Sequence, residues 1–205
     1  MNDAEIRQNF HRKRLRQQHA QKDTLVIDEL GLHHGKCRAD IAVINGRLVG
    51  YEIKSNNDSL RRLEEQIKSY SAVFDKVSII VGDRYINSIQ SHIPTWWGII
   101  VSVRGSKGAV NFEIMRKAQK NKRVEPISIA QLLWRDEAAE ILSKKKLPPK
   151  ILRQPRDVLY EQLTDLLSAN ELRKIVRDYL KRRRNWRCPE SLSRCDDLCQ
   201  QSPIL

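Results

Sequence analysis

Three ionisable residues in one short stretch have the types and the spacing of a catalytic site. Asp40 is followed, after eleven intervening residues, by the tripeptide Glu52-Ile53-Lys54, and both acids lie in otherwise apolar segments. Because side chains alternate faces along a strand, Glu52 and Lys54 must project from the same face of theirs. Two carboxylates can hold a hard metal ion through oxygen, and a fixed ammonium beside them can stabilise negative charge on a phosphate.

The position of Asp40 relative to the other two depends on the turn between the segments, where an Asn-Gly dipeptide predicts a β-hairpin. A two-residue turn would pair Asp40 with Tyr51, on the face away from Glu52. A three-residue turn, with Gly46 in the left-handed conformation, would pair Asp40 with Gly50 and keep it on the Glu52 face. We predict the second turn because it alone gathers the apolar side chains of the hairpin on one face. These side chains are Ile41, Val43, Val49, Tyr51 and Ile53.

The order of Asp40, a hairpin, the Glu-X-Lys tripeptide and a following helix with Gln66 and Tyr70 resembles the active-site pattern of the PD-(D/E)XK nuclease superfamily. Residues 1 to about 140 also resemble a family of small, largely uncharacterised bacterial and phage proteins placed in that superfamily, and the basic helical tail resembles theirs. Ala39 stands where the superfamily name has proline, at a position that supplies no ligand.

The resemblance implies a metal-dependent nuclease that hydrolyses phosphodiester bonds, with nucleic acid as partner, DNA expected over RNA, and Mg²⁺ or Mn²⁺ as cofactor. Asp40 and Glu52 would hold the metal, which lowers the pKa of bound water, and Lys54 would orient that water or stabilise the phosphate oxygens. The alternative is a catalytically silent module on the same fold that binds nucleic acid or docks a partner.

Other residues near this stretch have two interpretations. Glu29 ends an apolar segment, where it would face either the metal or a basic partner such as Arg38, and both remain open. Gln66 is expected to support the metal ligands or contact phosphate, and Tyr70, one turn later on the same side of the helix, to belong to the core. Glu5 in the first helix could approach the metal, but nothing local requires it.

The alternation of helical and strand patterns predicts an α/β fold, a restriction-endonuclease-like core whose central mixed β-sheet is flanked by helices, with a C-terminal basic helical extension. Trp96 and Trp97 are expected in the core, and His33 and His34 on a loop surface. The expected helices span 3–18, 60–74 and 128–142, and the expected strands and hairpins 24–29, 37–55, 77–81 and 98–114.

Charge divides the chain of 205 residues, whose formal net charge is +13. Residues 143–187 hold 14 Lys and Arg against 5 Asp and Glu, whereas the body of the chain is nearly neutral. A basic segment suits a polyanionic partner. We therefore expect a nuclease-like core over 1–118, a basic helical extension over 125–187 and a disordered tail over 188–205.

Two leucine-rich helices in the extension resemble a helix-turn-helix in outline, and the second bears a basic face. We expect this face to grip the nucleic-acid backbone rather than read sequence, because Lys and Arg neutralise phosphates in any register. Its residues are Arg173, Lys174, Arg177, Lys181, Arg182, Arg183 and Arg184.

The remaining features bound location and assembly. No apolar run approaches the roughly 20 residues that span a bilayer, so we expect a soluble, cytoplasmic protein without a membrane partner. Cys37, Cys188, Cys195 and Cys199 match no zinc spacing and are expected as free thiols. A homodimer remains open.

Overall fold

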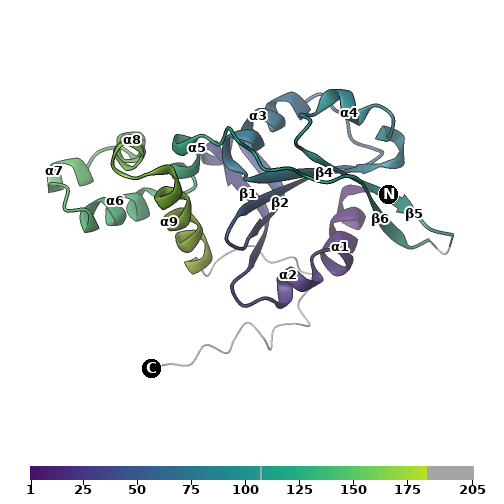
Figure 1. Ribbon diagram of the computed structural model, residues 1–205, viewed down its shortest axis with the longest axis horizontal. Coiled ribbons are helices and arrows are strands. Elements are labelled where there is room, and N and C mark those ends of the chain that lie inside the picture. Colours follow the sequence, from purple (N-terminus) through teal and green to yellow (C-terminus); the bar gives the residue numbers. More distant parts are fainter. Residues whose placement is uncertain (107, 184–205) are drawn as a thin grey trace.

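A six-stranded mixed sheet with helices on both faces organises the protein (Figure 1). The computed structural model describes residues 1–106 and 108–183. The strands lie in chain order; β3, β4 and β5 run parallel, and the other neighbouring pairs are antiparallel. The predicted α/β class, mixed sheet and C-terminal helices are confirmed. The strands are β1 (Leu25–Leu32), β2 (Cys37–Ile44), β3 (Leu48–Lys54), β4 (Lys76–Gly82), β5 (Gly98–Arg104) and β6 (Val110–Arg116).

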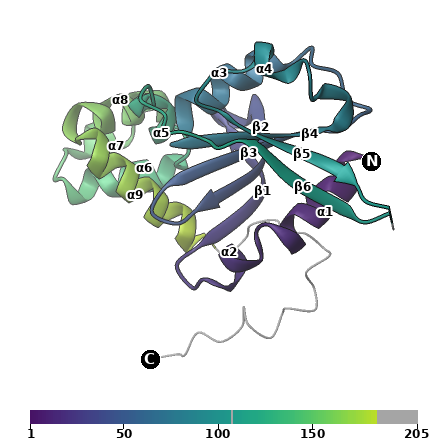
Figure 2. The ribbon, with the colours of Figure 1, turned by 45° about the vertical axis from the view of Figure 1, so that its right-hand side comes forward.

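The helices form two layers and a lobe. Helices α1 and α2 lie on one side of the sheet, α3 and α4 on the other, and α5 to α9 form a lobe beyond the β1 end (Figures 1 and 2). None of the described helices is both long and apolar enough to cross a membrane. The helices are α1 (Asp3–Lys13), α2 (Arg16–Ala20), α3 (Leu63–Val73), α4 (Ile89–His92), α5 (Pro126–Ala130), α6 (Arg135–Lys144), α7 (Pro149–Leu152), α8 (Arg156–Leu166) and α9 (Ala169–Arg182).

The smaller apolar layer lies between α1 and the sheet. Ile6, Phe10 and Leu15 are buried there against the apolar face predicted for the hairpin, which is thereby confirmed. Burying side chains of this size contributes about 1.5–3 kcal/mol each, so α1 is held firmly on the sheet. The strand residues of this layer are Ile41, Val43, Ile53, Ile80 and Ile100, with Val49 and Tyr51 packed at its edge.

The larger apolar layer covers the opposite face and continues into the helical lobe. Buried sheet residues such as Ile44 and Ile79 belong to the same cluster as Leu133, Leu163 and Val176 of the lobe. Trp97 is buried in this cluster and Trp96 packs against it, as predicted. The segments predicted as core and extension therefore share one hydrophobic core, and the predicted boundary is not a break in packing.

Two predicted helices are wrong as single helices. The first is interrupted after Lys13, where Leu15 turns into the smaller apolar layer. The segment predicted as one helix over 128–142 contains two helices. The Glu137 carboxylate accepts a hydrogen bond from the Trp134 backbone N–H at 2.7 Å, and this cap marks the start of a separate helix, α6. Local capping thus overrides an apolar periodicity that runs through both segments.

The hairpin turn differs from the prediction by one position. Ile44 pairs with Leu48, so the three-residue turn begins at residue 45 and the pairing is shifted by two residues. Extending this register puts Asp40 level with Glu52 rather than with Gly50. Because a two-residue shift returns each side chain to its own face, the segregation of apolar residues is the same in both registers.

Candidate active site

The ladder between β2 and β3 ends at the pair Ile41 and Tyr51, one level before the two acids. At the next level the Ile53 N–H donates to Asp40 Oδ2 at 2.7 Å, and the Asp40 N–H donates to the Tyr70 hydroxyl at 3.0 Å. Side-chain oxygens thus take the place of backbone acceptors. Asp40 lies in the gap between the strands, held from both sides.

Glu52 is 1% exposed and accepts hydrogen bonds from three side chains. Lys54 Nζ and Gln66 Nε2 donate to Oε1 at 2.6 and 2.5 Å, and the Tyr70 hydroxyl donates to Oε2 at 2.5 Å. Lys54 is 6% exposed, so both charges of the pair are buried. A buried ion pair gains little net stability after desolvation, so stability alone does not account for it. Tyr70 is a core residue, as predicted, and also joins the two acids.

Arg7 of α1 enters the site, although it is not among the residues predicted for it. Its Nη2 lies 3.1 Å from Asp40 Oδ1 and 3.0 Å from Glu29 Oε1, and its Nη1 donates to the Asp40 carbonyl at 2.6 Å. Burial lowers the pKa of Arg7, but the charges of Asp3 and Asp40 outweigh this, so the net shift is upward and the guanidinium stays charged. The four-residue spacing of Asp3 and Arg7 on one helix is the available sequence sign of this cluster.

The site perturbs the ionisation of Asp40. Burial, followed by the charge of Glu52, raises the pKa of Asp40 to about 7, although the Ile53 N–H and Arg7 act in the opposite direction. Burial and the same two acids raise the pKa of Tyr70, which therefore remains a donor at neutral pH. A carboxyl group that titrates near neutrality is typical of functional sites.

Glu29 lies in β1 beside this cluster, with a left-handed backbone at φ 58°. The strand's alternation reverses there, since Ile27 and Leu30 both face the larger core. The carboxylate forms ion pairs with Arg7 at 3.0 Å and with Arg38 at 3.4 Å. These are the contacts expected from the ion-pair interpretation of Glu29, with Arg7 as an additional partner.

The oxygen atoms of the site fit a hard cation, although the described residues do not bring three carboxylate, imidazole or thiol side chains together as a ready-made cage. Asp40 and Glu52 supply two carboxylates, and the buried Gln66 Oε1 accepts no hydrogen bond within the described part of the chain. Mg²⁺ and Mn²⁺ prefer oxygen ligands, and a cation would relieve the repulsion between the acids. Glu5 is directed elsewhere, because Arg104 Nη2 binds its carboxylate at 2.9 Å.

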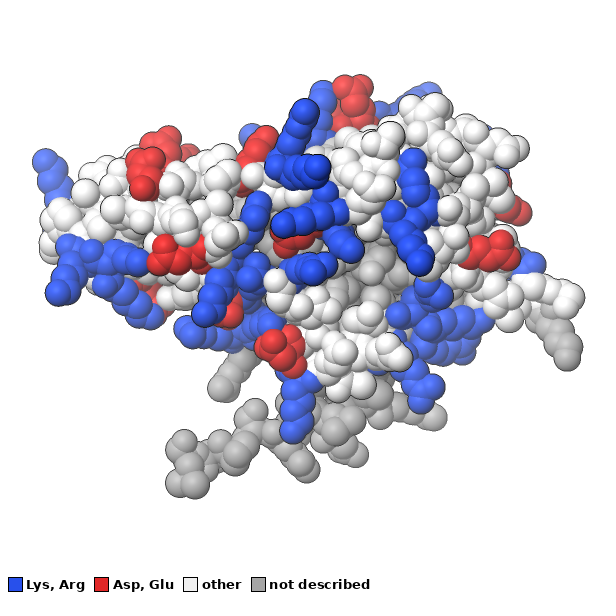
Figure 3. Space-filling view, viewed as in Figure 1, with Lys and Arg blue, Asp and Glu red and all other residues white. Residues whose placement is uncertain are grey.

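The predicted basic face on α9 is smaller than expected. Arg183 does not belong to it, since its side chain is 8% exposed and donates to Glu137 at 2.5 and 2.8 Å. Lys181 contacts Asp23 at 2.8 Å, and Arg184 lies outside the described residues, as does the predicted disordered tail. Figure 3 shows Lys and Arg spread over this face of the molecule, around α9 and elsewhere. The other predicted members, all at least partly exposed, are Arg173, Lys174, Arg177 and Arg182.

The fold and the site define an α/β protein with a six-stranded mixed sheet and a buried cluster of acids and lysine at the open end of its β2–β3 hairpin. The chain belongs to the bacteriophage P4 protein cII family, because the sequence model of that family matches residues 2–195. Protein cII of Enterobacteria phage P4 is 29% identical over 172 residues, which are 84% of this chain and 64% of that relative, so the chain spans less than two thirds of its length.

One solved structure is also similar, the SPO1766 protein of unknown function from Silicibacter pomeroyi. It is 17% identical, and the match covers 68% of this chain and 88% of that chain with a TM-score of 0.42.

Proposed function

We propose that this protein is a metal-dependent nuclease that hydrolyses phosphodiester bonds, with DNA as the substrate, and that its sheet and site are those of a PD-(D/E)XK enzyme. The observation that carries the proposal is the arrangement of Asp40, Glu52 and Lys54 where the β2–β3 ladder opens, joined by Tyr70. A cytoplasmic location goes with this proposal.

Each residue has a role that follows from its contacts. Asp40 and Glu52, with the Gln66 amide oxygen, would hold Mg²⁺ or Mn²⁺, which when bound lowers the pKa of water and offsets charge at the phosphate. Lys54 keeps a buried positive charge 2.6 Å from Glu52, where it can orient water or stabilise phosphate oxygens. Tyr70 holds the two acids in place across the strand gap.

Asp40 with a pKa near 7 gives this function a pH dependence. A metal ligand must be deprotonated, so cation affinity and cleavage should both rise as the pH passes from about 6 to 8. Arg7 supplies the positive charge that faces Asp40 in this structure. A cation bound between the acids would compete with that contact.

A second candidate is a nucleic-acid-binding or partner-docking module that does not turn over. Its support is the saturation of the acids by internal donors, since Glu52 accepts from three side chains and Asp40 from Arg7 and the Ile53 N–H. In this arrangement internal donors, rather than a cation, contact both acids. Intact Asp40, Glu52 and Lys54 favour the nuclease, because a retired site has no reason to keep all three.

The test is a panel of end-labelled single-stranded, duplex, nicked and junction DNA, with matched RNA, incubated with the protein and Mg²⁺, Mn²⁺ or EDTA. Cleavage of at least one DNA substrate is expected with either cation and not with EDTA. Glu52→Gln, which keeps the shape of the side chain, should abolish it. Glu64→Gln removes the same charge from an 81% exposed side chain on α3 and should cut at the wild-type rate.

The absence of cutting by folded wild-type protein across the whole panel would exclude the nuclease for these substrates. If the protein bound DNA under those conditions without cutting it, the result would support the catalytically silent binding module. Cutting that survives Glu52→Gln would show that another site, or a contaminant, is responsible.

A further inference from the structure

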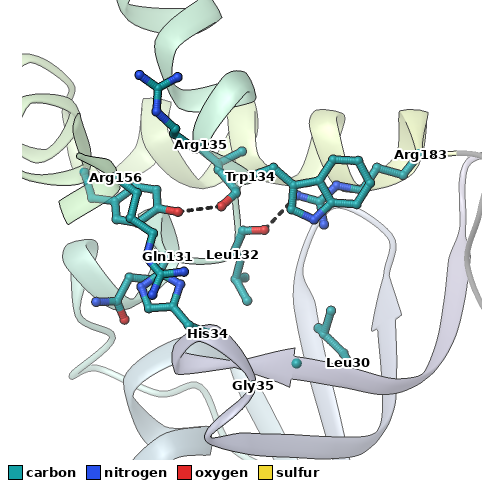
Figure 4. Close-up of a pocket in the computed structure, with 12 residues that line it drawn as sticks. Leu30, His34, Gly35, Gln131, Leu132, Trp134, Arg135, Arg156 and Arg183 are labelled. Atoms are coloured by element: carbon teal, nitrogen blue, oxygen red, sulfur yellow. Dashed lines mark hydrogen bonds between the residues drawn. The ribbon is translucent and has the colours of Figure 1, made fainter. Parts of the chain in front are cut away.

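A cavity of about 360 Å³ lies between the sheet and the helical lobe, and none of its described lining residues belongs to the acidic site (Figure 4). This volume lies within the range of roughly 300–1,000 Å³ typical of small-ligand sites. The end of β1 and the turn after it form one side, and the other side comes from the segment joining α5 to α6, from α8 and from the residue after α9. The described lining includes three arginines, a histidine and two aromatic rings, and no carboxylate.

Trp134 is an aromatic surface at this cavity. Its side chain is 60% exposed, which is unusual for the largest apolar residue type. The guanidinium of Arg183 lies 4.3 Å from the ring centroid and is fixed by Glu137 and by the Leu132 carbonyl. One face of the indole is thus covered by an immobile cation, and the exposed surface suits a flat ring that stacks on it.

The Arg156 guanidinium has N–H groups that can donate to a bound anion. Among the described residues its carboxylate partner is Asp157, at an N–O distance of 3.9 Å, too long for a hydrogen bond, and Asp157 is 72% exposed. Arg135 is different, because it donates to the carbonyls of Leu152 and Gln154. Arg156 is therefore the guanidinium on this wall best able to bind an anion.

The turn on the opposite side has a strained backbone. His33, His34 and Gly35 have φ values of 47°, 59° and 84°, a conformation disfavoured for residues other than glycine and often found at binding sites. His34 is exposed on the turn, as predicted for a loop surface, and its ring stacks on Tyr160 with centroids 5.6 Å apart and lines the cavity. Burial, and next the charge of Arg156, lower the pKa of His34, so its imidazole is neutral at pH 7 and can donate or accept.

We propose that this cavity holds one nucleotide of a single-stranded nucleic acid, with its base stacked on Trp134 and its phosphate bound by Arg156. The inference rests on the proposed function in taking nucleic acid as the partner, and adds that the substrate carries a splayed or single-stranded segment. The two sites adjoin along the sheet edge, since Gly31 of the cavity pairs with Arg38, which contacts Glu29 of the acidic cluster.

The test is fluorescence anisotropy with the full chain in EDTA, using a labelled oligothymidylate of about 12 nucleotides and a duplex of the same length. Trp134→Ala and Arg156→Ala should each weaken single-strand binding at least about fivefold and change duplex binding less than about twofold. Trp134→Phe, which keeps a flat ring, should retain most of the affinity. Arg153→Ala removes the same charge outside the cavity and should change single-strand binding less than about twofold.

Unchanged single-strand affinity in folded Trp134→Ala would overturn the proposal, and so would equal losses for single strand and duplex, which would indicate a general charge effect. A parallel titration with free thymidine monophosphate distinguishes the source of the nucleotide. If Trp134→Ala lost the free nucleotide and bound the oligonucleotide normally, the strand assignment would be overturned in favour of a free nucleotide. Because these measurements need no metal and no cleavage, a failure of the nuclease proposal and a failure of this one are separable.

Discussion

The raised pKa of Asp40 predicts that removing its charge should stabilise the metal-free protein. The shift from the ordinary value of 3.8 to about 7 is about three pH units, and each unit corresponds to about 1.4 kcal/mol. Asp40→Asn, which keeps an oxygen for the Ile53 N–H, should therefore raise the free energy of unfolding by up to about 4 kcal/mol above pH 7.

The pH dependence gives this prediction a definite sign. Between pH 3.8 and about 7 the folded protein keeps a proton on Asp40 that the unfolded chain has released, so wild-type stability falls as the pH rises through this window and then levels off. The variant lacks the group. The difference between the two proteins should be near zero at the acid end of the window and largest above pH 7, as measured by urea unfolding in EDTA at several pH values.

Magnesium should narrow this difference in stability. At a concentration ten times its Kd, Mg²⁺ would stabilise the wild type by about 1.4 kcal/mol at pH 8, whereas the variant, lacking one ligand, should gain little. Asp136→Asn is the matched control, because its side chain is 93% exposed, and neither its pH profile nor its response to Mg²⁺ should differ from the wild type.

Two results would refute this reasoning. If Asp40→Asn were less stable than the wild type at pH 8 in EDTA, the attraction of Arg7 would exceed the costs of burial and of the Glu52 charge. If Mg²⁺ raised the melting temperature of both proteins equally, Asp40 would not be a ligand.

Three further changes test other parts of the structure. Lys54→Ala should lower cleavage at least about a hundredfold while the Mg²⁺ stabilisation persists, because lysine is no ligand; loss of both would make its role structural. Gly46 has the predicted positive φ, 83°, so Gly46→Val should lower the free energy of unfolding by about 1–2 kcal/mol and Gly46→Asn by less, and equal stabilities would contradict this. A triple alanine variant of Arg173, Lys174 and Arg177 should bind DNA with a weaker salt dependence, in which the slope of log affinity against log salt concentration is smaller in magnitude by about 2 to 3. An unchanged slope would exclude these residues as phosphate contacts.

The parts of the fold that the sequence predicts are those with local causes. The apolar face of the hairpin, the strand through Ile79 and the burial of Trp97 follow from alternation and from continuous apolar runs. The turn position does not, because a two-residue shift of the register leaves every face unchanged. The break before α6 was missed because the apolar periodicity runs straight across the carboxylate cap from Glu137.

In the site, too, contacts between residues close in sequence can be predicted, whereas contacts between distant residues cannot. Spacing along one strand predicts the Glu52–Lys54 pair, since neighbours two apart share a face. Arg7 reaches Asp40 across 33 positions in sequence, and no local pattern specifies that contact. Arg183 belongs to the run of basic residues that predicts a phosphate-binding face, whereas the lobe folds its side chain against Glu137.

The shared core of sheet and lobe has a consequence for the newly made chain. While the ribosome is still adding residues 126–182, the apolar side chains of the sheet and of α3 that share the larger core with α5 to α9 lack those neighbours. Exposed apolar surface is prone to aggregate, so synthesis halted before α9 should yield an insoluble fragment or one held by chaperones rather than a smaller working unit. Ribosome-bound chains of increasing length, probed by limited proteolysis, should become resistant in one late step, after α9 has emerged from the exit tunnel.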